Sequence, residues 1–90
     1  MNDTLHLAIK KKWFDMIVSG EKREEYRDVK PYWEQRLSGK TYKFVKFRNG
    51  YRSDSPTITK RLTYISVGLG HVTWGAPDNK FVFRIGLGDL

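Results

Sequence analysis

The sequence has no cysteine and only two histidines, His6 and His71, among its 90 residues. Without cysteine, neither a disulfide nor a thiolate metal site can stabilise the fold, and no cysteine nucleophile is available. Two histidines are too few for a histidine-rich metal cluster, so we expect no metal and no cofactor. A chain free of cysteine suits a reducing compartment, and we expect a cytoplasmic location.

Long apolar runs are also missing. No stretch approaches the roughly 18 apolar residues that span a bilayer, and the N-terminus lacks the apolar segment of a signal peptide. We therefore expect no membrane partner. A chain of 90 residues has the length of one domain and supports one hydrophobic core. We expect a single domain over residues 1–90.

Acidic side chains are scarce in the second part of the chain. Residues 40–90 carry 9 basic and 3 acidic side chains, whereas residues 1–39 carry 8 basic and 7 acidic ones, and the net charge is +7. A positive field of this kind attracts polyanions and speeds their encounter. We expect RNA or a nucleotide-like ligand as the partner; the alternative is a basic surface without one.

The spacing of apolar residues predicts five strands and two short helices. Leu5, Leu7 and Ile9 alternate with other residues, as in a strand with one buried face. The helices are expected at residues 11–19, closed by Gly20, and from Pro31 to a close at Gly39. The remaining strands are expected at residues 22–28, 42–47, 57–69 and 81–87.

The strand at residues 57–69 changes its apolar face partway along. The switch falls between Tyr64 and Ile65, which predicts a β-bulge or a sharp bend there. Five strands and two helices without a regular βαβ rhythm disfavour a doubly wound sheet. An α+β fold with a closed or nearly closed five-stranded barrel is the better solution, because a barrel also hides the edges of its sheet.

The densest group of charges lies at residues 19–27, at the junction between the first helix and the second strand. In a regular strand Arg23, Glu25 and Arg27 share one face, and Lys22, Glu24 and Tyr26 share the other. Lys22 stands at the turn into the strand and can swing to either side. Glu25 between two arginines favours its carboxylate form. The planar fork of Arg27 suits a phosphate or a base edge. The alternative is a solvated edge strand with ordinary surface ion pairs.

Three further groups are candidate ligand contacts. Lys12 stands with two other lysines at the start of a helix, where a bound anion would relieve the unfavourable dipole. Arg48, Asn49 and Tyr51 form a basic turn with an aromatic ring, suited to stacking a base. Trp74 lies in a loop and can stack a ligand. The structural alternatives are solvated lysines, a plain Asn-Gly turn and a tryptophan that plugs the barrel end.

Gly20, Lys22, Glu25 and Arg27 match the pattern Gly-x-Lys-x-x-Glu-x-Arg. With this motif the sequence resembles the ASCH domain family of the PUA-like superfamily, and stretches at residues 25–33, 47–51 and 74–77 resemble its small single-domain bacterial and phage members. The resemblance covers nearly the whole chain. It implies a PUA-like β-barrel with a cleft between barrel and helices, lined by the motif residues.

The resemblance further implies binding of RNA or a modified nucleoside, in connection with RNA metabolism or translation. The expected contacts are Lys22, Glu25, Arg27 and Arg48, with Tyr51 or Trp74 stacking. A second possibility is a small hydrolase of acetylated cytidine or of RNA, in which Lys22 and Glu25 would be catalytic. A third is a phage-type module that grips a protein partner.

The family members that deacylate acetylated cytidine resemble this chain at Lys22, but they carry a threonine nucleophile where this chain has Glu25, and they use a glutamate later in the chain. No glutamate follows Glu34 here. A threonine-based amide hydrolysis is therefore disfavoured. Lys22 could still act as a base if burial lowered its pKa, but Glu25 beside it would oppose that shift.

Overall fold

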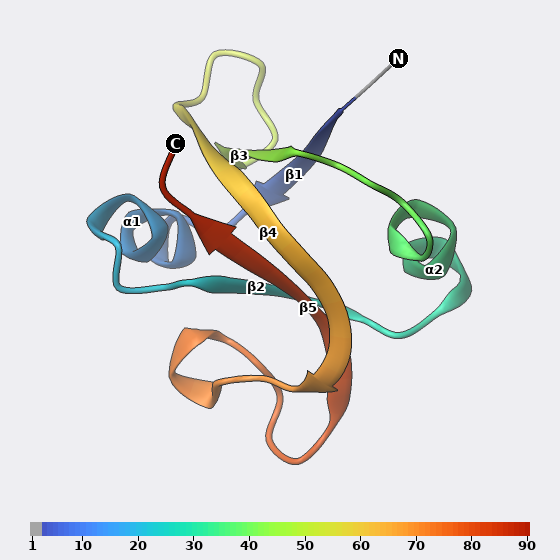
Figure 1. The fold of residues 1–90 in the computed structure, drawn as a ribbon. Helices are drawn as coiled ribbons and strands as arrows, with labels where there is room; N and C mark the ends of the chain where they lie inside the picture. The colour runs from blue at the N-terminus through green and yellow to red at the C-terminus, as the bar shows by residue number, and fades with distance from the viewer. Residues whose placement is uncertain (1–2) are drawn as a thin grey trace.

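The structure is a computed structural model that describes residues 3–90. The molecule has five strands and two α-helices. The two helices lie on opposite sides of it (Figure 1). Within the described residues, no helix is long and apolar enough to cross a membrane. The elements follow in the order β1 (Thr4–Ile9), α1 (Lys11–Ser19), β2 (Glu24–Asp28), α2 (Pro31–Leu37), β3 (Phe44–Asn49), β4 (Thr57–Leu69), the 3₁₀ turn η1 (Val72–Trp74) and β5 (Phe81–Gly88).

All five strands belong to one sheet with the order β1-β3-β4-β5-β2. β1 and β3 run parallel, and the other neighbours run antiparallel. The α+β class with five strands and two helices is confirmed. The sheet, however, curls into a half-barrel, and no backbone ladder joins its edge strands β1 and β2 within residues 3–90. The expected closure of the barrel is therefore absent from the strand pairing.

The concave face of the sheet carries the hydrophobic core. Apolar residues of β1, β3 and β5 alternate inward, and each helix adds one stripe, because both the strand and the helix periods place these residues on one face. The most deeply buried side chains are Leu5, Ile17, Leu37, Val45, Phe47, Val82 and Ile85. Val82 is the exception among them, since it lies on the opposite face of β5 from Ile85. The core thus sits between the curled sheet and the two helices.

Helix ends follow the predicted signals closely. Gly20 ends α1 in the left-handed conformation, with φ 86° and its N–H bonded to the carbonyl of Ile17. Pro31 opens α2, whose last helical residue is Leu37 and whose cap is Ser38. β2 begins at Glu24 instead of residue 22, so Lys22 lies in the turn before the strand.

The irregularity in β4 lies earlier than predicted. The register shifts between Leu62 and Tyr64, so the extra residue is Thr63, and the prediction of a switch after Tyr64 is wrong by one step. Leu62 and Ile65 both face the core, and Tyr64 faces the outside opposite Gly86. Sequence parity alone assigned Tyr64 to the inner face because it could not show the hydrogen bond that draws its hydroxyl outward to Glu24.

The pairing of Tyr64 with Gly86 predicts a strict requirement for glycine. A methyl group at Gly86 would overlap the Tyr64 ring and the Thr63 hydroxyl. Gly86→Ala should therefore lower the free energy of unfolding by about 1–3 kcal/mol, measured by urea denaturation. In a Tyr64→Ala background the same substitution should cost less. An equal cost in both backgrounds would contradict this account.

Candidate functional site

Three motif side chains form a buried chain of charges on the inner face of the half-barrel. Lys22 Nζ lies 3.3 Å from one carboxylate oxygen of Glu25, and Arg27 Nη2 lies 2.6 Å from the other. The side chains of Lys22, Glu25 and Arg27 are 1 %, 9 % and 19 % exposed. The alternative of a solvated strand with ordinary surface ion pairs is wrong, because the side chains of Lys22 and Glu25 are almost completely buried.

Local structure explains why Lys22 meets Glu25. The left-handed Gly20 turns the chain, and the Lys22 N–H then bonds to the carbonyl of Met16 at 2.9 Å. This folds the turn back beneath α1, where the Lys22 ammonium lies 5.3 Å from the ring centroid of Trp13. The ammonium also donates a hydrogen bond to the carbonyl of Trp74.

Burial perturbs the ionisation of Lys22. Removal from water lowers the pKa of Lys22 below its ordinary value, and the attraction of Glu25 only partly opposes that shift. The rings of Trp13 and Tyr26 flank the ammonium and offer it their negative faces. Lys22 is therefore held by Glu25, by a carbonyl and by two rings, and it presents almost no surface to solvent.

Of the three ion-paired side chains, Arg27 is the one that borders a hollow. Its Nη2 also donates to the carbonyl of Ala8 at 3.2 Å, so its guanidinium spans from β2 to the edge of β1. The Trp33 ring of α2 lies 4.9 Å from the guanidinium carbon. A hollow of about 260 Å³ opens here, lined by Tyr26, Arg27, Asp28, Trp33, Gly75, Pro77 and Val82. Among the described residues, the buried Arg27 Nε has no hydrogen-bond acceptor.

A second carboxylate, that of Glu24, is buried on the opposite face of β2. It accepts hydrogen bonds from Tyr26 at 2.9 Å, from Arg84 at 2.9 Å and from the Tyr64 hydroxyl. Burial acts to raise the pKa of Glu24, but these donors outweigh it and hold that pKa below its ordinary value. Burial raises the pKa of Tyr26. The back-to-back placement of Glu24 and Glu25 follows from the alternation of strand side chains.

Trp74 takes part through its backbone more than through its ring. Its carbonyl accepts from Lys22, and its half-buried ring lies 4.3 Å from that of His71. The His71 N–H in turn donates to the Tyr26 hydroxyl at 2.9 Å. The loop after β4 is therefore tied to Tyr26 of β2 and to Lys22 in the turn before it, and the Trp74 ring does not line the hollow beside Arg27.

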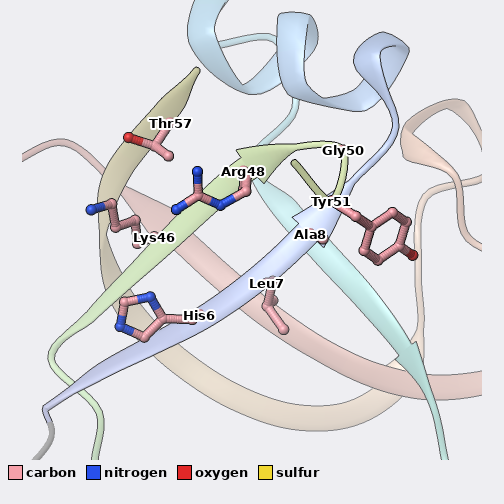
Figure 2. A pocket seen from close by; sticks show the side chains of 8 residues that line it. All are labelled: His6, Leu7, Ala8, Lys46, Arg48, Gly50, Tyr51 and Thr57. Carbon is pink, nitrogen blue, oxygen red and sulfur yellow. The ribbon is translucent and has the colours of Figure 1, made fainter. Parts of the chain in front are cut away.

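The basic turn after β3 lies at a different place. Arg48 and Tyr51 line a separate hollow of about 250 Å³ on the outer face of β1 and β3 (Figure 2). Asn49 pairs with Ile9 at the end of the parallel ladder, and its N–H bonds to the carbonyl of Pro56. The structure thus separates Arg48, Asn49 and Tyr51 from Lys22, Glu25 and Arg27.

Lys12 does not reach either hollow. Its ammonium lies 4.7 Å from the ring of Trp13, on the exposed side of α1. The neighbouring Lys11 forms an ion pair with Asp15 at 2.6 Å. These contacts give the lysines at the helix start local partners.

Sequence reasoning missed the aromatic walls of the site. Neither Trp13 nor Trp33 was among the expected ligand contacts. Both rings pack against the core and also lie beside the cations of Lys22 and Arg27. Periodicity identifies the apolar stripe of a helix but does not encode what it faces. The roles of Tyr64 and Arg84 were likewise missed, since both depend on long-range strand pairing.

Comparison with protein-family models, with curated proteins and with solved structures finds no match to this chain. Over the part that the structure describes, no group of three or more histidine, cysteine, aspartate or glutamate side chains could hold a metal ion. The groups that the site offers for binding or catalysis are a buried chain of ion pairs, the Arg27 guanidinium and the faces of aromatic rings.

The depressed pKa of Glu24 predicts a loss of stability in acid. The folded-state pKa lies below the ordinary value of 4.5, so the unfolded chain binds more protons as pH falls through this window. The free energy of unfolding should therefore decline from about pH 5 downward. Glu24→Gln cannot titrate and should show a shallower decline in urea denaturation, whereas the exposed-site control Glu34→Gln should follow the wild type. Equal slopes for all three proteins would contradict the assignment.

Proposed function

We propose that the chain is an ASCH-type domain of the PUA-like superfamily that binds RNA or a modified nucleoside in the hollow beside Arg27. The observation that carries the proposal is the buried chain from Lys22 through Glu25 to Arg27, which ends at the wall of that hollow. The burial of Lys22, Glu25 and Arg27 on the inner face of the sheet supports the cleft that the family resemblance implies.

The chemistry of the hollow suits a base edge or a phosphate. A guanidinium offers a planar fork of donors, and Arg27 lines this hollow. Trp33 and Tyr26 add aromatic surface to the same hollow. An aromatic face beside a charged fork is the arrangement by which proteins stack an unpaired base and hold its polar edge.

In this proposal Lys22 and Glu25 are positioning residues. Glu25 fixes the Arg27 guanidinium through a 2.6 Å contact, and Lys22 neutralises the other carboxylate oxygen. A guanidinium held in its bound orientation loses less conformational entropy when a ligand arrives. The ion-pair chain therefore contributes to affinity without either residue touching the ligand.

Arg27→Gln should weaken binding of a short single-stranded RNA and of nucleoside monophosphates by about ten- to a hundredfold, because a charge-assisted hydrogen bond is worth roughly 1.5–3 kcal/mol. Tryptophan fluorescence at two salt concentrations measures the affinity, and added salt should weaken RNA binding. The matched control is Arg23→Gln, which removes the same charge from an exposed neighbour. No affinity of the wild-type protein at low salt would defeat the proposal.

A hydrolase of acetylated cytidine or of RNA is the second candidate. The favouring observation is that burial lowers the pKa of Lys22, as a general base requires. Turnover should then disappear in Lys22→Met and in Glu25→Gln while circular dichroism shows a retained fold. Incubation with each substrate, followed by chromatography, measures the turnover. Unchanged substrate with the wild-type protein would exclude this candidate and leave binding alone.

A further inference from the structure

The outer face of β1 and β3 carries a second group of side chains whose chemistry the hollow beside Arg27 does not use. The register pairs His6 with Lys46 and Ala8 with Arg48, so all four point away from the core. β4 adds Thr57, which pairs with Arg48. Figure 2 shows Lys46 and Arg48 projecting to one side of the small Ala8 and Tyr51 projecting to the other. The two hollows share no lining residue.

Charge at this outer hollow has one sign. Lys46 and Arg48 are cations, His6 is a further hydrogen-bonding group, and no carboxylate is among the lining residues. Asp54, in the adjoining loop, pairs with Arg52 at 3.3 Å. The outer hollow therefore presents donors and positive charge toward an anion.

Arg48 is fixed before any ligand arrives. Its Nη1 donates to the backbone carbonyls of Ser53, Ser55 and Arg52 at 2.8, 3.3 and 3.4 Å. One nitrogen thus ties the guanidinium to the loop after β3, while the group still lines the hollow. This restraint reduces the entropy that a phosphate contact would cost.

Tyr51 is the most exposed of the large apolar or aromatic side chains at 92 %. The residue before it is anchored next to β1, because the Gly50 N–H bonds to the carbonyl of Ile9 at 2.9 Å. An uncovered aromatic ring beside this anchored turn offers a stacking platform for a base. Only an unpaired base has a free face for such a ring, which favours a single strand over a duplex.

From these observations we infer that the outer face around Ala8 binds single-stranded nucleic acid, with the backbone phosphates at Lys46 and Arg48 and one base stacked on Tyr51. The spacing along β3 places the two cations on one face two residues apart. Ala8 also joins this face to the first hollow, since its carbonyl accepts from Arg27. A strand of several nucleotides could therefore continue over the edge of β1.

The test compares a labelled single-stranded octanucleotide with a mononucleotide, using fluorescence anisotropy for the first and tryptophan fluorescence for the second. Tyr51→Ala should weaken octanucleotide binding about tenfold, as expected for one lost stacking contact. Tyr51→Phe should retain the affinity. Lys46→Gln should weaken binding and reduce the slope of affinity against salt by roughly 0.7.

Matched control variants distinguish binding at this surface from non-specific attraction of the nucleic acid to a positively charged protein. Phe81→Ala removes an exposed ring from β5, and Lys30→Gln removes an exposed charge that precedes α2. Both should bind the octanucleotide as the wild type does. Equal losses in Tyr51→Ala and Phe81→Ala, or equal competition by poly-aspartate of the same charge, would overturn the inference.

The same experiment distinguishes the two proposals. If Tyr51→Ala binds the octanucleotide normally while Arg27→Gln loses the mononucleotide, the outer surface is overturned and the hollow beside Arg27 stands. If the mononucleotide does not bind but octanucleotide binding depends on Tyr51 and Lys46, the outer surface is supported and the first proposal fails.

Discussion

The carboxylate of Glu25, buried between two cations, is the interaction on which the arrangement of this molecule depends. It connects the turn after α1, through Lys22, to the edge of β1, through Arg27 and the carbonyl of Ala8. Taking three charges out of water costs several kcal/mol for each ion, and mutual attraction offsets this only when the remaining polar atoms are also satisfied. Here a backbone carbonyl and aromatic rings satisfy most of them.

A second carboxylate, that of Glu24, is likewise buried among charged and polar partners on the other face of β2. It accepts hydrogen bonds from Tyr26, Tyr64 and Arg84, and the Tyr26 hydroxyl accepts one from the His71 N–H. The close approach of the Tyr26 ring to Gly70 leaves no space for a side chain there. Adjacent glutamates thus connect β2 inward to the helices and outward to the loop after β4. The five-residue strand β2 therefore carries one buried carboxylate on each face.

The sequence predicted most of the elements because local signals decide them. The limits of α1 and β4 agree with the structure, Gly20 takes the expected cap conformation, and Pro31 opens the second helix. The bulge was misplaced and closure of the barrel was overestimated, since both depend on how distant strands pair. For the site, strand alternation correctly grouped Glu25 with Arg27. Strand alternation could not show that Arg48 and Tyr51 line a different hollow from Arg27, because that separation depends on how distant strands pair.

The gap between the edge strands β1 and β2 bears on whether another copy of the protein can add a strand to this sheet. An uncovered strand edge is a template on which another chain can add a strand, and flat sheets aggregate by this route. The curl of this sheet turns both edges toward one another, and the Arg27 side chain bridges them at Ala8. An incoming strand would have to displace a guanidinium already paired with a buried carboxylate. Strand addition at this gap would therefore break the contacts of Arg27 with Ala8 and Glu25, which disfavours it.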